Sequence, residues 1–260
     1  MKGSKKMKKT VVNATILKNE QIAPDIFDMV LHTTLARDAK AGQFIKLYPD
    51  NNKNLLPRPI SICEIDKEKE TLRIVYQKIG EGTCLFSTMK QGDTIRVLGN
   101  CGNGYKIFEE EKTHIFVGGG IGVPPLLETC KQVKGKKIVI LGFRTGQFLK
   151  EDFEKLGATV YIATDDGSVG FKGNVVELMK KENITGDYIY SCGPKPMLYA
   201  LTQYAKDKNI YTQVSMEERM ACGIGACVGC VIKIFENGEI VHKKVCKDGP
   251  VFNSLEVVYK

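Results

Sequence analysis

The chain has 260 residues, 43% of them hydrophobic, and a net charge of +8 at neutral pH. This length and hydrophobic content suit two domains of about 100 to 150 residues each and exclude disorder on a large scale. Five lysines lie within the first nine residues, so the charge indicates a short solvated tail, and we expect no binding of nucleic acid.

Residues 10–106 are predicted to form a small antiparallel barrel. Short runs in which apolar and polar residues alternate, such as TVVNATILKN and TLRIVYQKIG, are separated by Gly, Pro and Asn. Alternation with a period of two indicates strands with one buried face, and many short strands of this kind suggest a barrel.

Residues 107–215 are predicted to form a doubly wound parallel α/β domain. The runs THIFVGGG, KKIVILGFR, ATVYIATDD and DYIYSCGP are apolar without alternation, and a helix-like stretch follows each of them. Strands buried on both faces that alternate with helices indicate a parallel sheet. A last strand, YTQVSMEE, leads into residues 216–260, where we expect turns and short strands. The fold class is therefore α+β with several domains.

The stretch FVGGGIGVPPL follows the first strand of this domain and opens a helix. Its glycines, Gly118, Gly119, Gly120 and Gly122, allow a pyrophosphate to approach the backbone, and a helix N-terminus favours an anion. This place is where such folds bind nucleotides, although a merely structural turn is the alternative. Cys192, in SCGPKPM, ends the fourth strand. It is either a buried structural cysteine or a contact of the nicotinamide ring.

Nine cysteines occur, and four of them crowd near the end of the chain as C-x4-C-x2-C-x15-C. No secretion signal and no apolar window of the ~18 residues that a membrane span needs are found, so we expect a cytoplasmic protein with reduced thiols. The spacing is that of plant-type [2Fe-2S] proteins, whereas zinc sites more often use two C-x2-C pairs. A cluster is favoured over zinc or free thiols. The four cysteines are Cys222, Cys227, Cys230 and Cys246.

These sites together indicate electron transfer. Nicotinamide exchanges a hydride pair and an iron-sulfur cluster takes single electrons, so a flavin is expected between them. Only three histidines occur, and no acid/base pair marks a pocket for an organic substrate. Electrons are therefore expected to leave to another protein. A redox-sensing or zinc-scaffold module is the alternative from another class, and it predicts no flavin.

The order of five motifs resembles the ferredoxin-NADP reductase superfamily. They are RPIS, GEGTCLFSTMKQGD, GNCGNGY, GGGIGVPPL and CGPKPM. The resemblance implies an FAD-binding barrel before an NAD-binding domain, with the arginine of RPIS on the pyrophosphate, the serine near the flavin edge and an isoleucine where an aromatic residue usually stacks. The residues it assigns to FAD are Arg58, Pro59, Ile60, Ser61, Val75, Tyr76, Gln77, Gly82 and Thr83.

Within that superfamily, the chain most resembles the electron transfer subunits of type B dihydroorotate dehydrogenases. RPISI, TDDGSVGFKG, MEERMACGIGACVGC and VCKDGPVF carry this resemblance. It implies that the four clustered cysteines ligate a [2Fe-2S] cluster. It also implies an FMN-containing catalytic partner, in a heterotetramer with two of each chain, that converts (S)-dihydroorotate to orotate with NAD+ as acceptor in pyrimidine biosynthesis. Related subunits of sulfide dehydrogenases, ferredoxin:NADP oxidoreductases and hydrogenases are the second choice.

The choice between NAD and NADP depends on three charged residues. Arg144, after the second strand of the α/β domain, could meet a 2′-phosphate. Asp165 and Asp166, after the third strand, disfavour further negative charge. The resemblance favours NAD.

Overall fold

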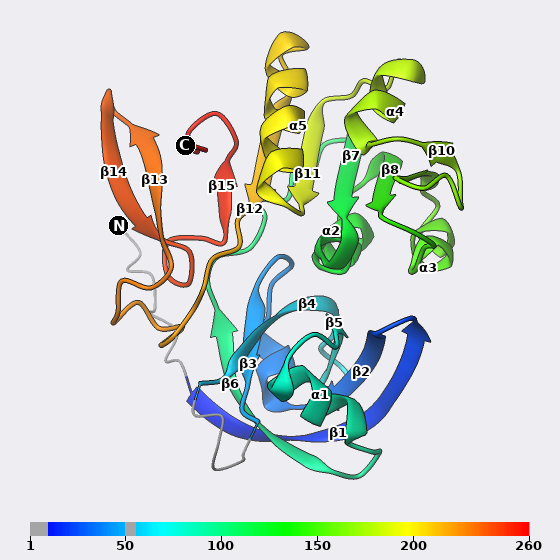
Figure 1. The fold of residues 1–260 in the computed structure, drawn as a ribbon. Coiled ribbons are helices and arrows are strands. Elements are labelled where there is room, and N and C mark those ends of the chain that lie inside the picture. Colours follow the sequence, from blue (N-terminus) through cyan, green and yellow to red (C-terminus); the bar gives the residue numbers. More distant parts are fainter. Residues whose placement is uncertain (1–9, 50–55, 260) are drawn as a thin grey trace.

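The computed structural model describes residues 10–49 and 56–259, which form a barrel, an α/β domain and a C-terminal segment (Figure 1). The barrel is closed and antiparallel, in the strand order β1-β2-β5-β4-β3-β6. A short helix, α1 (Glu81–Thr88), and a 3-10 turn, η1 (Thr34–Asp38), accompany it. The strands are β1 (Thr10–Ala23), β2 (Ile26–His32), β3 (Phe44–Leu47), β4 (Arg58–Asp66), β5 (Thr71–Gln77) and β6 (Thr94–Cys101).

Strand β3 shows how the barrel separates its two faces. Ile45 and Leu47 are completely buried in the barrel core. Phe44 and Lys46 alternate with them and therefore point out of the barrel. Both are nevertheless buried, and Phe44 belongs to a core that it shares with the C-terminal segment. The outward face of β3 is thus covered by another part of the chain.

The α/β domain has a seven-stranded sheet in the order β10-β9-β8-β7-β11-β12-β15. The first six strands are parallel, and β15 pairs antiparallel with β12. The strands are β7 (Lys112–Gly119), β8 (Gly135–Phe143), β9 (Thr159–Thr164), β10 (Phe171–Lys172), β11 (Tyr188–Cys192), β12 (Tyr211–Ser215) and β15 (Val251–Asn253).

Helices cover both faces of this sheet, as a doubly wound domain requires. Along β7, Phe116 faces the core that contains α2 and α3, whereas Ile115 and Val117 face the core that contains α4 and α5. Burial on both faces explains why these strands lack alternation in the sequence. The helices are α2 (Pro125–Gln132), α3 (Lys150–Lys155), α4 (Val175–Lys181) and α5 (Lys195–Asp207), with a 3-10 turn η2 (Gly120–Gly122).

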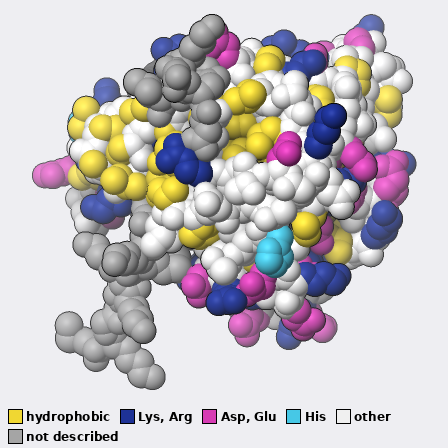
Figure 2. Space-filling model, turned by 90° about the horizontal axis from the view of Figure 1, so that it is seen from below, with side chains coloured by type: hydrophobic (Ala, Val, Ile, Leu, Met, Phe, Trp, Pro, Cys, Tyr) yellow, Lys and Arg dark blue, Asp and Glu magenta, His cyan; other side chains and the backbone are white. Residues whose placement is uncertain are grey.

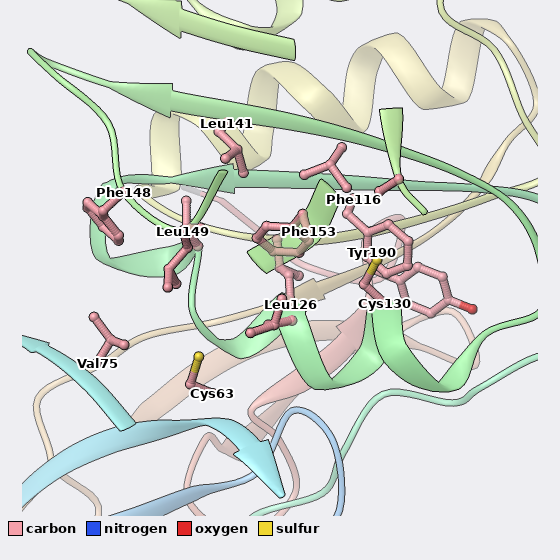
Figure 3. Packing of buried hydrophobic residues seen from close by; sticks show 14 of the residues in the cluster. Cys63, Val75, Phe116, Leu126, Cys130, Leu141, Phe148, Leu149, Phe153 and Tyr190 are labelled. Carbon is pink, nitrogen blue, oxygen red and sulfur yellow. The ribbon is translucent and has the colours of Figure 1, made fainter. Parts of the chain in front are cut away.

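The barrel and the α/β domain share a hydrophobic core. Cys63 and Val75 of the barrel pack in one cluster with Leu126 of α2, and Figure 3 shows Cys63 facing this helix. A buried carboxylate of α2, Glu128, accepts a hydrogen bond from the Ile65 amide of β4 at 2.8 Å. The two domains are therefore packed together and do not merely adjoin.

The C-terminal segment begins and ends at the same edge of the sheet. After β12 the chain forms a cysteine-bearing loop and a hairpin of β13 (Val231–Glu236) and β14 (Glu239–Lys244) (Figure 1). It then returns as β15 beside β12. Its core joins all three parts of the chain and includes Phe44 of the barrel, Val214 of β12, and Cys230 and Cys246 of the segment itself.

Candidate functional site

The predicted nicotinamide turn lies where the strand order of the α/β sheet reverses. The chain continues from β7 to β8 on one side, whereas β11 lies on the other side of β7. Gly118 at the end of β7 is in register with Cys192 at the end of β11. Such a switch point at the carboxyl ends of strands is where open α/β sheets bind nucleotides.

Glycine is required at this turn by close contacts. A Cβ atom at Gly122 would lie 2.4 Å from the carbonyl oxygen of Cys192, and one at Gly119 would lie 2.6 Å from Sδ of Met197. Gly120 has φ +54°, in the left-handed region. The structure therefore brings the glycine turn and Cys192 together, as the sequence predicts for a single site.

The Cys192 thiol is half-buried and holds its proton. Burial, with a smaller contribution from the charge of Glu217, raises its pKa to about 12, although a hydrogen bond with Ser215 acts in the opposite direction. A thiol with this pKa is not a nucleophile at neutral pH, because only the thiolate attacks. Cys192 can act here as a neutral contact or as packing.

The predicted phosphate site of FAD is formed by β4 and the start of α1. Arg58 lies against Gly82, where a Cβ atom would come within 2.9 Å of the arginine Nε. The Thr83 hydroxyl accepts hydrogen bonds from the Gly80 and Ile79 amides, at 3.1 and 3.0 Å, and so fixes the turn before the helix. A guanidinium beside the first turn of a helix is a donor set that suits a pyrophosphate.

The remaining residues of the RPIS motif face two ways. Ile60 packs against the barrel core, so its neighbours Pro59 and Ser61 lie on the other side of β4. Pro59 lines an open hollow together with the start of α5 and the stretch that follows β12. The other residues of the hollow are Lys195, Glu217, Glu218, Arg219 and Met220. This hollow is bordered by all three parts of the chain.

The end of β5 contributes in a different way. Val75 packs in the core between the two domains, and Gln77 is half-buried. Tyr76 is completely buried inside the barrel, where it stacks on Phe27 and its hydroxyl donates a hydrogen bond to Oδ1 of Asn19 at 3.0 Å. Its side chain holds the barrel together, so only its backbone is available to a ligand.

The four clustered cysteines lie as two pairs. The amide of Cys227 donates to Sγ of Cys222 at 3.3 Å, and the amide of Cys246 donates to Sγ of Cys230 at 3.5 Å. Cys230 and Cys246 are buried, whereas Cys222 and Cys227 are half-buried. In residues 10–49 and 56–259, no three His, Cys, Asp or Glu side chains are grouped as ligands of one metal ion. Two pairs of thiols match a two-iron cluster, in which each iron takes two cysteines.

Backbone amides surround the half-buried pair. Burial raises the pKa of the Cys222 thiol, but hydrogen bonds from the backbone of Cys227, Ile224 and Ala226 outweigh it and lower the pKa to about 6. By contrast, burial raises the pKa of Cys246 to about 12, and contact with the Cys230 thiol adds to this. Amides directed at sulfur stabilise a thiolate, which is the form that binds iron.

Two glycines shape the loop that carries these amides. Gly223 and Gly225 have φ +69° and +82°, which L-residues with a side chain rarely adopt. Gly229 lacks a positive φ, and a Cβ there would make only an ordinary contact with Sγ of Cys227 at 3.6 Å, so no steric reason requires glycine at this position. Unusual dihedral angles therefore occur at two of the three glycines of this loop.

Two lysines hold the same loop, and the sequence did not single them out. Lys46 of β3 donates from Nζ to the carbonyl of Ala221, and Lys244 of β14 donates to the carbonyl of Gly225 at 2.7 Å. Burial lowers the pKa of Lys46, and the charges of neighbouring thiols, including Cys101 and Cys222, oppose this effect. Lys46 could have been noticed in the sequence only because it is a lysine within an otherwise apolar strand, FIKL.

Comparison with known proteins agrees with this arrangement. The model of the iron-sulfur cluster binding domain of dihydroorotate dehydrogenase B matches residues 217–258. The electron transfer subunit of dihydroorotate dehydrogenase B (NAD(+)) from Geobacillus sp. (strain WCH70) is 44% identical over 253 residues, which cover 94% of this chain and 97% of that protein. The chain belongs to this family of electron transfer subunits.

Other relatives extend the comparison. The subunit of the same name from Streptococcus pneumoniae serotype 4 is 43% identical, over 94% of this chain and 99% of that protein. A solved NADH-dependent reduced ferredoxin-NADP oxidoreductase, studied for flavin-based electron bifurcation, superposes with a TM-score of 0.83 at 29% identity and covers 100% of this chain and 92% of that one. A ferredoxin NADP+ reductase from Neisseria gonorrhoeae, with a TM-score of 0.62, 19% identity and coverage of 77% and 92%, shares the fold.

The family membership confirms the predicted class of function, electron transfer in an NAD-dependent oxidoreductase. The predicted fold class is confirmed by the closed antiparallel barrel and the parallel sheet described above. None of the helices in the described ranges combines the length and hydrophobicity that a membrane crossing requires.

Proposed function

We propose that the chain carries electrons between NAD(H) and an FMN-containing catalytic subunit that converts (S)-dihydroorotate to orotate, in pyrimidine biosynthesis. The observation that carries this function is the meeting of three sites around one hollow: Pro59 of the flavin motif, Lys195 near the nicotinamide turn, and Met220 at the start of the cysteine loop line it together. When bound, the cluster would exchange single electrons with the partner, and FAD would exchange single electrons with the cluster and a hydride with nicotinamide. Because oxidation of dihydroorotate releases two electrons, the net flow runs from the partner through the cluster and FAD to NAD+.

The flavin is held by the barrel in this proposal. Arg58 and the first turn of α1, with Gly82 and Thr83, bind the pyrophosphate, because a planar fork and helix amides lie side by side there. Pro59 and Ser61 face the same side of β4, toward the ring. Ile60 packs inward, so the ring is not stacked on it.

The nicotinamide nucleotide is held at the switch point of the sheet. Gly118, Gly119, Gly120 and Gly122 allow the backbone to approach its pyrophosphate, and Cys192 contacts the ring as a neutral thiol.

The preference for NAD is supported by the end of β9. Hydrogen bonds from the backbone and hydroxyl of Ser168 lower the pKa of Asp166 to about 2, so this carboxylate is charged at all physiological pH values. The backbone amide of Asp166 donates to the carbonyl of Arg144, so the main chains of these two residues lie side by side at the ends of β8 and β9. A fixed negative charge there opposes the 2′-phosphate of NADP.

The cluster is held by Cys222, Cys227, Cys230 and Cys246 in this proposal. The catalytic partner docks beside it, since Ile224 and Val228 on the cysteine loop are 48% and 75% exposed although they are apolar. Seen from below, hydrophobic side chains gather toward the side on which this loop lies in Figure 1 (Figure 2). We infer a heterotetramer with two copies of each chain, as the family resemblance implies.

We also place the protein in the cytoplasm. The chain has an odd number of cysteines, nine, and four of them are proposed ligands that must stay reduced, which suits a reducing compartment.

The proposal is tested by purifying the complex from its native host and by adding NADH to the isolated subunit. A partner of dihydroorotate dehydrogenase type at a one-to-one ratio is expected, together with FAD, two irons per chain and visible bands that fade with NADH. A colourless chain with one zinc would contradict the proposal and support a zinc scaffold.

A second candidate is the flavin and iron-sulfur subunit of a ferredoxin:NADP oxidoreductase, a sulfide dehydrogenase or a hydrogenase complex. It is favoured by the structural likeness along the whole chain to the NADH-dependent oxidoreductase described above. The same purification separates the two, because a partner that carries iron-sulfur clusters and no dihydroorotate-dependent activity would select this candidate.

A further inference from the structure

Lys46 is a completely buried lysine between the barrel and the cysteine loop. It points out of the barrel from β3, where its strand neighbours are Pro59 on β4 and Leu98 on β6. A buried ammonium is costly unless negative charge or hydrogen-bond acceptors surround it. Its surroundings therefore indicate what it does.

The cysteine loop wraps directly over this side chain. Nζ of Lys46 bonds the carbonyl of Ala221, the residue before the first clustered cysteine. A Cβ atom at Gly223 would lie 2.3 Å from Cδ of Lys46, so the loop passes as close as a glycine permits. Lys46 thus touches the loop on both sides of Cys222.

The groups whose charge favours the Lys46 ammonium are thiols. They are Cys101 of β6 and three of the four clustered cysteines, Cys222, Cys246 and Cys227. When Cys222, Cys246 and Cys227 are thiolates on iron, the ammonium lies beside the net negative charge of the cluster, whereas Cys101 is not a proposed ligand. A charge in a site without water acts more strongly than one at the surface.

We propose that Lys46 is a positioning residue that raises the reduction potential of the cluster and fixes the cysteine loop against the flavin barrel. The inference rests on the proposed ligation by the four cysteines. On reduction the cluster gains one electron from the reduced flavin of the same chain, and Lys46 keeps its proton. The added negative charge is stabilised by the fixed ammonium, because net charge and hydrogen bonding set the potential of such clusters.

The test is a redox titration of the full-length subunit with FAD bound, followed by the electron paramagnetic resonance signal of the reduced cluster. Lys46→Met keeps the length of the side chain and removes its charge. We expect the equilibrium constant for cluster reduction to fall about tenfold, which is about 59 mV for a one-electron couple. Iron and FAD content are measured in the same samples and should match the unaltered protein.

Lys244→Met is the matched control. Lys244 also donates to a loop carbonyl, that of Gly225, but it is only half-buried, so water screens its charge. Its replacement is expected to change the equilibrium constant by less than about threefold. Equal shifts in the two variants would overturn the special role of Lys46, as would an unchanged potential in Lys46→Met with full iron content.

Lys46→Arg is the second variant, and it is needed if Lys46→Met does not retain iron. It keeps the positive charge and changes the shape of the side chain. Retention of iron by the arginine variant supports a need for positive charge at this position. Loss of iron from both variants, with FAD still bound, shows that the loop needs the shape of the lysine side chain and overturns the proposed effect of its charge on the potential. Absence of a [2Fe-2S] signal from the unaltered protein would refute the cluster itself, and this inference with it.

Discussion

The nicotinamide turn and the cysteine loop are built in opposite ways. The turn is formed within one domain, by backbone at the ends of β7 and β11, and its fit depends on glycines that bring Gly122 against Cys192. The loop lies outside any sheet and is held from elsewhere, by Lys46 of the barrel and Lys244 of the hairpin. A site made by a sheet is fixed by its strands, whereas a site made by a loop needs supports from distant parts of the chain.

The first prediction tests the cysteine loop. Cys227→Ser should lose the cluster, so iron content falls and electron delivery to the catalytic partner drops to background, because serine replaces a thiolate ligand. Reduction of FAD by NADH, measured by stopped-flow absorbance, should remain nearly unchanged. Cys84→Ser, at an exposed thiol of α1, is the control and should keep iron. Equal loss of both steps would contradict the serial order of the sites.

Gly122→Ala tests the nicotinamide turn. The added methyl group would lie 2.4 Å from the Cys192 carbonyl, so the turn must move away from β11. We expect reduction of FAD by NADH to fall about 100-fold and the free energy of unfolding to fall by about 1 to 3 kcal/mol, the usual cost of overpacking. Iron content should not change.

Gly157→Ala is the control for that change. Gly157 has φ +76° with open space around it, so alanine there adds backbone strain of about 1 to 2 kcal/mol without a steric clash. If both glycine variants lose the reaction with NADH to the same extent, the close contact at Gly122 is not what shapes the nucleotide site.

A third change concerns the proposed flavin site at β4 and the start of α1. Arg58→Gln should weaken FAD binding about 10- to 100-fold, because one or two charge-assisted hydrogen bonds to the pyrophosphate are lost. Equilibrium titration of the FAD-free protein with FAD measures it. Arg37→Gln, at an exposed arginine paired with Glu70, should leave FAD affinity as it is. Unchanged affinity in Arg58→Gln would remove Arg58 from the flavin site.

The smallest effect is expected at Cys192. Cys192→Ala should slow hydride transfer about tenfold, or about 1.4 kcal/mol of activation free energy, and leave FAD and iron in place. A rate equal to that of the unaltered protein would make this cysteine packing only.

The pH dependence follows from the same thiol. Since burial raises the pKa of Cys192 to about 12, this group should cause no change in hydride-transfer rate between about pH 6 and 9. The neutral Cys192 thiol makes its full contribution to the free energy of unfolding below the pKa of a cysteine in the unfolded chain. That contribution is lost as the pH rises toward 12, because the unfolded chain then gives up the proton first. A rate step near pH 8.5 that disappears in Cys192→Ala would contradict the raised pKa.

The sequence predicts features that depend on local pattern, and it does not predict those that depend on distant parts of the chain. Strands such as β7 and β8 show their burial on both faces directly, so the α/β sheet and its glycine turn could be found from local pattern. The cysteine spacing likewise singles out the four thiols that the structure brings together as two pairs. Lys46 could not be found, because its role depends on a loop 175 residues further along the chain. Strand β15 is only three residues long, and its pairing with β12 depends on a return of the chain that no local pattern encodes.

The return of the chain to the sheet at β15 attaches the C-terminal segment at both of its ends. Because the chain leaves the sheet at β12 and rejoins it at β15, the cysteine loop and hairpin form an excursion whose two ends are anchored on adjacent strands. A pull from a docked partner on the loop is therefore shared by both anchors and by the sheet behind them. Docking of the proposed partner on this loop would then leave the place of the four cysteines relative to the sheet unchanged.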